Sequence, residues 1–165
     1  MHKRWIMSCQ SKQDTRRFNH EVALWLHSLA DWKVAGTFTL ARVDPVSGRT
    51  VNVYQCRRAF GYFIGRLNKA VFKNGCTRHG YRVASAYVLE GMVDGHHPHI
   101  HFSLSAPPHM AMGEFIDQVE HLAQKNSLFL PERHITRYRD SNWMSYCMKD
   151  GIEGLAVEDV QLANP

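Results

Sequence analysis

The sequence predicts an α+β fold built on an antiparallel sheet. Segments with the two-residue alternation of strands occur between segments whose apolar residues recur at helical spacing. Two of the extended segments are joined by a short turn, which favours antiparallel pairing. Neither a repeat nor a linker divides the 165 residues, and a chain of this length forms one core, so residues 1–165 are predicted to be a single domain.

The first half of the chain contains two predicted helices separated by a predicted strand. Asp14 is a suitable N-cap for a helix over 15–31, in which apolar residues recur at intervals of three and four. An extended segment over 34–42 follows, and a turn-rich stretch ends it. A second helix is predicted over 57–72, where apolar side chains form one stripe and Gly75 lies just past the end.

The clearest pair of strands lies in the second half. Residues 82–90 and 98–105 are extended segments, and the stretch between them contains two glycines and reads as a turn. A third helix is predicted over 112–125 from its apolar spacing, and a further strand over 132–139. These elements predict a sheet with helices on one or both of its faces.

A short helix is predicted after the last strand. Asp140 or Ser141 caps it, it runs through Lys149, and Gly151 ends it. The remaining residues, 152–165, are mildly acidic, and the sequence predicts no role for them.

The composition is that of a basic folded protein. Lys and Arg number 20 against 15 Asp and Glu, a net charge of +5. This excess favours a polyanionic partner, because each neutralised phosphate releases counterions, although a solvated basic surface explains the charge equally well. The four cysteines form no C-x-x-C pair, and no apolar run reaches the about 18 residues of a membrane span, so we expect a soluble cytoplasmic protein with no membrane partner.

The most informative segment reads HPHIHF, over residues 97–102. Because side chains alternate across a strand, His97, His99 and His101 are expected on one face. Ile100 and Phe102 are expected on the other face, where helices cover them. Imidazoles two residues apart can surround one divalent cation, although a chain with 11 histidines contains about one H-x-H pair by chance.

Glu90 ends the strand that precedes the histidines. If the two strands pair as a hairpin, Glu90 lies beside His99 and His101 on the same face. Two imidazoles and one carboxylate would leave coordination positions open for substrate oxygens. The alternative for Glu90 is an ordinary exposed carboxylate at a strand end.

Tyr146 and Lys149 are three residues apart on a predicted helix and therefore share a face. A phenol has a pKa of about 10, so it needs nearby positive charge to ionise usefully at neutral pH. Lys149 and a bound metal would both favour the phenolate and stabilise charge that develops on a phosphate. The alternative is a half-buried helix tyrosine with a solvated lysine.

The order of these motifs resembles that of the HUH endonucleases, specifically the single-tyrosine replication initiator (Rep) branch. His99 and His101 match the family's His-hydrophobic-His strand, and Glu90 matches the glutamate that completes its metal site. Tyr146 and Lys149 match its Y-x-x-K helix. The stretch EGMVDGHHPHIHF also looks like the family's E-G…G-x-x-P-H-x-H pattern.

The resemblance implies a ferredoxin- or RRM-like fold, a central antiparallel sheet flanked by helices with the histidine motif on a central strand. It implies Mn or Mg as the metal, single-stranded DNA from an origin or hairpin as substrate, and a 5′-phosphotyrosyl intermediate. The expected function is sequence-specific DNA nicking and joining that initiates rolling-circle replication of a plasmid, phage or other mobile element in a bacterial or archaeal host. The F-T-L stretch at residues 38–40 matches a family motif usually taken as structural or DNA-contacting.

The sequence also departs from the family pattern. His97 is a third histidine, with a metal ligand, a proton donor and a DNA contact as alternative roles. Asn142 and Asp150 stand four residues from Tyr146, so the two-tyrosine variants do not fit. The G-x-x-x-x-G-K-[ST] motif is missing, which predicts no helicase domain and unwinding by a host helicase alongside a host polymerase.

Two pairs of arginines are predicted DNA contacts. Arg57 and Arg58 belong to a basic cluster around the second helix, and Arg137 and Arg139 lie on the strand that leads into the tyrosine helix. A solvated helix face is the alternative for any one of them.

Three other functions fit parts of the pattern. A single-strand transposase of the HUH class uses the same chemistry, but the resemblance implies glutamine rather than lysine near its tyrosine. A non-catalytic RRM-like nucleic-acid-binding module would carry the histidines incidentally. A small metal oxygenase would use two histidines and one carboxylate, but the sequence offers no cosubstrate site. Relaxases fit less well, because their tyrosine usually precedes the histidines.

Overall fold

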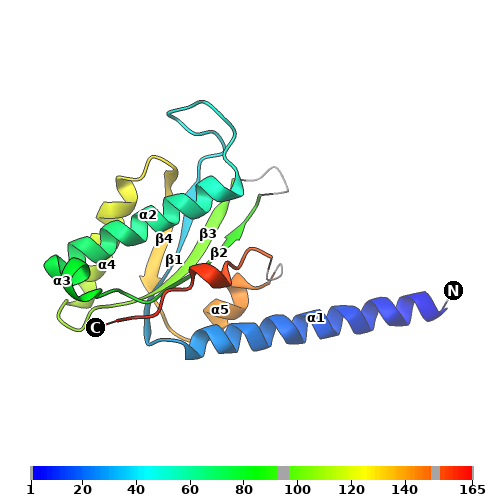
Figure 1. Cartoon of the computed structure of the whole chain (residues 1–165). Coiled ribbons are helices and arrows are strands. Elements are labelled where there is room, and N and C mark those ends of the chain that lie inside the picture. The colour runs from blue at the N-terminus through cyan, green and yellow to red at the C-terminus, as the bar shows by residue number, and fades with distance from the viewer. Residues whose placement is uncertain (1, 93–96, 150–152, 165) are drawn as a thin grey trace.

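The computed structural model describes residues 2–92, 97–149 and 153–164, with side chains from residue 12 onward. Figure 1 shows a twisted sheet with helices around it and a long N-terminal helix that projects beyond the sheet. The elements in chain order are α1 (His2–Ser28), β1 (Trp32–Leu40), α2 (Val53–Phe72), α3 (Asn74–His79), β2 (Ser85–Glu90), β3 (His99–Ser105), α4 (Met112–Gln124), β4 (Phe129–Arg137), α5 (Asn142–Cys147) and a 3₁₀ turn, η1 (Val157–Asp159).

The sheet has four strands in the order β2-β3-β1-β4, and every neighbouring pair is antiparallel. From β1 to β4 the chain follows the order strand, helix, strand, strand, helix, strand, with β3 and β1 in the centre. This connectivity is that of split βαβ units. The predicted α+β class with an antiparallel sheet flanked by helices is confirmed, and the arrangement is compatible with a ferredoxin- or RRM-like fold.

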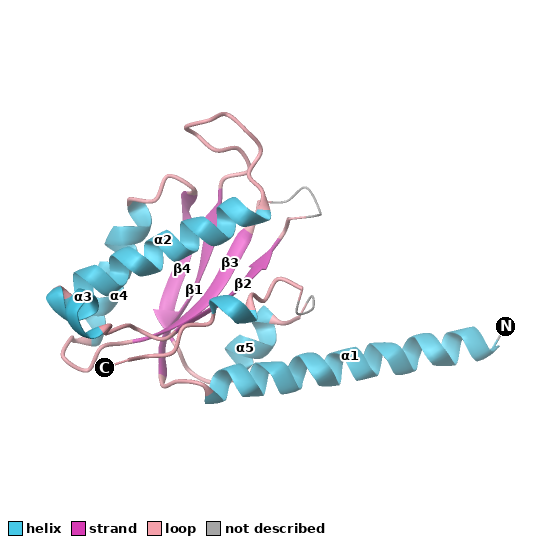
Figure 2. Ribbon diagram, viewed as in Figure 1, coloured by secondary structure: helices cyan, strands magenta, loops and turns pink. Residues whose placement is uncertain are grey.

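Helices α2 and α4 cover one face of the sheet, and an aromatic core fills the space between (Figure 2). Phe38 on β1 is completely buried, with ring centroids of Phe102, Phe129 and Phe63 at 4.4, 4.5 and 5.2 Å. Aromatic pairs at such spacings contribute beyond the area that they bury. Phe38, the first residue of the F-T-L stretch, is therefore a structural residue.

Helix α2 begins at Val53, four residues before its predicted start. Asn52 is its N-cap: the Gln55 N–H donates to Asn52 Oδ1 over 2.9 Å, and the Asn52 N–H donates to Gln55 Oε1 over 3.0 Å. This reciprocal capping box satisfies two helix N–H groups and fixes the start of the helix.

Helices α1 and α5 lie on the opposite face of the sheet, where a second apolar cluster forms. Leu26 of α1 and Met144 and Cys147 of α5 are buried in this cluster with Val88 of β2. Helix α1 begins at His2, so the prediction that Asp14 is its N-cap is wrong. Residues 2–14 contain neither glycine nor proline, and thus no residue type that readily ends a helix.

Helix α5 starts close to the predicted position. Ser141 is the N-cap residue, but its side chain makes no capping hydrogen bond; instead the Asn142 N–H donates to Asp140 Oδ1 over 2.9 Å. The regular helix ends at Cys147, and backbone hydrogen bonding extends the turn to Lys149. The predicted end at Gly151 lies outside the described residues.

The C-terminal segment, residues 153–164, lies along the outer edge of β2. Isolated antiparallel bridges pair Val88 with Leu155, Ser85 with Gln161 and Arg82 with Asn164. An uncovered edge strand offers unpaired backbone groups, and this segment satisfies several of them. None of the helices in the described part of the chain has the length and apolar character needed to traverse a bilayer.

Gly36 on β1 leaves the room that the core needs. A Cβ at this position would lie 2.5 Å from Phe102 Cζ and 2.7 Å from the His134 carbonyl oxygen. We expect Gly36→Ala to lower the free energy of unfolding by about 1–3 kcal/mol through overpacking. Urea denaturation measures the change, and Gly113→Ala on α4, where no described atom lies within 4 Å of the new Cβ, is the control that should leave stability unchanged or slightly raised.

Candidate active site

Strand β3 presents its histidines to the face that carries α5. Ile100 and Phe102 are buried on the α2 side, as the alternation predicts, so His99 and His101 lie on the other side. Across the sheet, Glu90 of β2 is paired with His99, and Thr37 of β1 is paired with His101. The two imidazole rings are nearly parallel, at 10°, with centroids 6.5 Å apart. A central strand and its two neighbours thus supply one polar patch.

A chain of hydrogen bonds passes through His101, whose exposed fraction is 5 %. His101 Nε2 lies 3.0 Å from Glu90 Oε2, and Thr37 Oγ1 lies 2.8 Å from His101 Nδ1. Burial lowers the pKa of His101 below its ordinary value, and the neighbouring Glu90 carboxylate opposes this shift. The ring is therefore favoured in its neutral form, in which Nε2–H donates to Glu90 and the threonine hydroxyl donates to Nδ1.

Helix α5 brings Tyr146 onto the same patch. The Tyr146 and His101 ring centroids are 5.4 Å apart with an interplanar angle of 78°, and the exposed fraction of Tyr146 is 49 %. Trp143 stacks on Tyr146 at 5.7 Å, and its indole N–H donates to the Phe102 carbonyl oxygen over 3.2 Å. Trp143 therefore anchors the tyrosine to the sheet while one side of the phenol stays open to solvent.

Lys149 connects the tyrosine to the carboxylate. Its Nζ donates to Glu90 Oε2 over 2.9 Å and lies 4.4 Å from the centroid of the Tyr146 ring. A cation at this distance is attracted to the face of the aromatic ring. The adjacent Cys147 is not a rival nucleophile, because burial raises the pKa of its thiol to about 12.

The donor set fits a divalent cation, although the side chains are not arranged as a closed metal cage. Within the described residues no group of three or more His, Cys, Asp or Glu side chains is placed to hold an ion as it stands. His101 and Lys149 both contact Glu90 Oε2, whereas Oε1 is buried and has no hydrogen-bond partner among the described atoms. A buried carboxylate oxygen beside two imidazoles is the kind of acceptor that a cation would complete.

The remaining predicted residues lie elsewhere. His97 precedes β3, and its Nδ1–H donates to the Leu40 carbonyl oxygen over 3.2 Å. Arg57 and Arg58 are on α2, at the opposite face of the sheet, and Arg57 forms an ion pair with Glu158 at 2.8 Å.

Arg137 and Arg139 are not brought to the patch. Arg137 ends β4, and alternation places it on the same face as Arg133, whose Nε pairs with Glu120 of α4 at 2.8 Å. That face is opposite the histidines. Arg139 follows β4 in an exposed segment. The alternating arginines therefore follow the α4 side of the edge strand.

Residues of α1 also adjoin the site, although no sequence pattern indicates them. Arg16, Asn19 and His20 line a groove of about 250 Å³ together with Ser145, Met148 and Lys149. Asn19 Nδ2 donates to the Met148 carbonyl oxygen over 3.2 Å, which holds α1 against the tyrosine helix. The docking of α1 on this face brings two further basic side chains, those of Arg16 and His20, into the same groove as Lys149. No local sequence pattern predicts this docking.

Comparisons of the chain with models of protein families, with curated proteins and with solved structures found no match.

The geometry predicts the residues on which metal affinity depends. We expect Glu90→Gln and His101→Ala to weaken Mn binding by more than about 100-fold, because removing even an outer-shell partner of a metal ligand costs about 10- to 100-fold. Isothermal titration calorimetry of the whole protein measures the affinity. His109→Ala is the control, since that ring contacts the Val71 carbonyl oxygen at a separate site. His97→Ala should also bind Mn normally; equal affinity in Glu90→Gln and wild type would show that the carboxylate is not a ligand.

Proposed function

We propose that the chain is a metal-dependent HUH-type enzyme that nicks and joins single-stranded DNA, with Tyr146 as the nucleophile. The observation that carries the proposal is the position of a half-exposed phenol directly beside His101, with Lys149 between the phenol and Glu90. A general structural role does not require a half-buried carboxylate, two histidines, a lysine and an accessible tyrosine on one patch. Active sites collect such groups.

The residues divide the chemical work. Glu90, His99 and His101 would hold Mn or Mg, which when bound supplies Lewis-acid polarisation of the scissile phosphate. The Thr37 hydroxyl can accept a hydrogen bond from His101 Nδ1–H as well as donate one to Nδ1. When a metal is bound it would therefore stabilise the other tautomer of His101, in which Nε2 carries no proton and can coordinate. Lys149 supplies positive charge beside the phenol and the phosphate.

The proposed reaction conserves phosphodiester bonds. The Tyr146 oxygen, having lost its proton to solvent, attacks phosphorus, and the bond from phosphorus to the 3′-oxygen breaks. The released 3′-oxygen takes up a proton, and the 5′-phosphate stays attached to the tyrosine. A later 3′-hydroxyl attacks the phosphotyrosyl link and restores the phenol, so joining needs no ATP.

The supported biological role is initiation of rolling-circle replication of a mobile element in a bacterial or archaeal host. Lys149 favours this role over transposition, for which the resemblance implies glutamine near the tyrosine. A host helicase and a host polymerase are the proposed partners in this role.

The nucleophile is tested with the whole protein, Mn and a pool of single-stranded oligonucleotides labelled at the 3′ end. We expect a labelled adduct that survives denaturing electrophoresis, and we expect Tyr146→Phe to abolish it, because the new side chain has no oxygen to attack phosphorus. Tyr62→Phe removes the hydroxyl of another exposed tyrosine, on α2, and should leave the adduct intact. An adduct that persists in Tyr146→Phe refutes the assignment, and binding without any adduct supports the non-catalytic RRM-like module.

The groove between α1 and α5 offers a path for the phosphate next to the scissile one. Arg16 is exposed and lines this groove beside Lys149. We expect Arg16→Ala to reduce the slope of log affinity against log salt by about 1, the value for one lost phosphate contact. Fluorescence anisotropy at several salt concentrations measures the slope. Arg66→Ala on α2, whose guanidinium lies over the Tyr62 ring, is the matched control and should keep the wild-type slope.

A further inference from the structure

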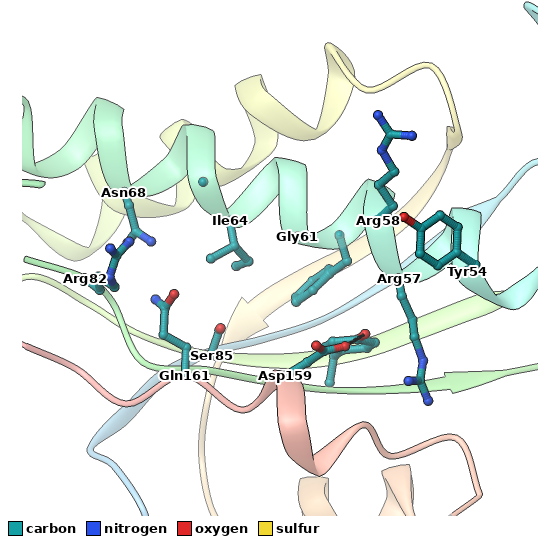
Figure 3. Close-up of a pocket in the computed structure, with 13 residues that line it drawn as sticks. Tyr54, Arg57, Arg58, Gly61, Ile64, Asn68, Arg82, Ser85, Asp159 and Gln161 are labelled. Atoms are coloured by element: carbon teal, nitrogen blue, oxygen red, sulfur yellow. Dashed lines mark hydrogen bonds between the residues drawn. The ribbon is translucent and has the colours of Figure 1, made fainter. Parts of the chain in front are cut away.

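A second groove lies on the α2 side of the sheet, away from the histidines. It has a volume of about 580 Å³ and runs between α2 on one side and β2 with the C-terminal segment on the other. Figure 3 shows residues of both walls, with Tyr54, Arg57 and Arg58 at one end and Asn68 and Arg82 at the other; the Arg58 side chain extends away from Asp159 and Gln161. No residue of this groove belongs to the proposed catalytic site.

Positive charge prevails in the groove. Arg57, Arg58 and Arg82 line it, whereas Asp159 is the one acidic residue among the lining residues. Arg57 also pairs with Glu158 at 2.8 Å, but this carboxylate is at the exposed rim and an incoming phosphate can compete for the guanidinium. The Asp159 carboxylate is already engaged, because the Tyr87 hydroxyl donates to Asp159 Oδ2 over 2.6 Å. The guanidinium groups stand at both ends of the groove rather than in one place, which suits an elongated anion better than a single small one (Figure 3).

Two hydrogen-bond donors at the groove lack acceptors. Asn68 has an exposed fraction of 1 %; its Oδ1 accepts from the Val83 N–H over 2.9 Å, but its Nδ2 has no partner among the described atoms. Arg57 Nε is likewise buried without a described partner. Buried donors are almost always satisfied, so donors left open beside a groove indicate an acceptor that comes from outside the chain.

Glycines keep the groove open. Gly61 and Gly65 are one turn apart on α2 and both line the groove, and no described atom lies within 4 Å of a Cβ built on either. Glycine inside a helix is less stable than alanine. Two glycines on the face of α2 that lines the groove therefore indicate that side chains at these positions would occupy space that a ligand needs. At the mouth, the Tyr54 ring is exposed to 71 % and offers a stacking surface.

We propose that this groove binds a nucleotide: phosphate oxygens meet the guanidinium groups and the open donors, and the base stacks on Tyr54. The chemistry is shared by free nucleotides and by single-stranded DNA. The spread of the three arginines along the groove favours a strand, in which successive phosphates reach both ends. The site does not depend on Tyr146 chemistry, and binding there is measurable without any nicking.

The test fills the groove without disturbing the core. Gly65→Leu replaces a glycine with a better helix former in space that no described atom occupies, so the variant should fold. We expect it to weaken binding of a fluorescein-labelled single-stranded oligonucleotide by about tenfold, the effect of losing one stacked base. Gly113→Leu on α4 is the matched control, because a Cβ there also has no described atom within 4 Å and Gly113 does not line the groove.

A second variant and a second probe sharpen the result. Arg58→Glu reverses an exposed charge at the mouth and should weaken oligonucleotide binding and lower the salt slope. A deoxynucleoside monophosphate is titrated in parallel. If the monophosphate binds but the oligonucleotide does not, and Gly65→Leu abolishes this binding, the groove is a nucleotide site whose ligand is a free nucleotide. If neither probe distinguishes Gly65→Leu and Arg58→Glu from wild type, the groove holds only solvent and the proposal is overturned.

The outcome is separable from the catalytic proposal. The labelled adduct reports the chemistry of Tyr146, whereas the change in affinity caused by Gly65→Leu reports occupancy of the groove. Groove variants that weaken binding in a protein that never forms an adduct would support the nucleotide site and remove the nicking function. If the groove variants have no effect on binding in a protein that forms the adduct, the nicking function is supported and the nucleotide site is overturned.

Discussion

The two-residue period of β3 is the constraint on which the rest of the molecule depends. Ile100, Phe102 and Leu104 fit the aromatic core beneath α2 and α4, and the same register turns His99 and His101 toward α5. A slip of one residue would bury imidazoles in the core and expose the apolar side chains, so the core enforces the register and the register places the polar patch. Because β3 is central, strands on both sides add to that patch, Glu90 from β2 and Thr37 from β1.

The charge balance at Glu90 determines how the patch can open. The exposed fraction of the Glu90 side chain is 17 %, and that of Lys149 is 40 %. An ion pair with one partner this accessible is screened by water and contributes on the order of 1 kcal/mol, far less than the about 3–5 kcal/mol lost when a fully buried pair is broken. Lys149 can therefore leave Glu90 for an incoming phosphate at small cost. Glu90 Oε1, which has no hydrogen-bond partner among the described atoms, and Oε2, once Lys149 has left it, are then both acceptors for a cation.

How much the sequence predicts depends on how local the signal is. The faces of β3, the pairing of Glu90 with His99 and the helix that carries Tyr146 all follow from periods within a few residues, and the structure has them as expected. Contacts between distant segments were not predictable in this way. The docking of α1 beside α5 brings Arg16 near Lys149, although more than half of the chain separates the two residues in sequence. The C-terminal segment pairs with β2 through isolated bridges, and its mildly acidic sequence contains no pattern that predicts this pairing. Arg137 shows what alternation alone cannot predict. The two-residue period of β4 divides its side chains between two faces, but it does not tell which of these faces is the one that carries the histidines.

Strand β2 joins the two proposed binding surfaces. Val88 and Glu90 are directed to the histidine side, whereas Tyr87 packs on Phe60 of α2 and lines the second groove. One sheet thickness therefore separates the grooves, and the route between them passes the outer edge of β2.

The C-terminal segment covers this edge and supplies a wall of the second groove through Gln161. A strand held in both grooves would therefore have to pass this edge. A single-stranded nucleic acid has the flexibility for this bend, which a duplex has not, and the positions of the two grooves thus favour the same class of ligand that their chemistry favours separately.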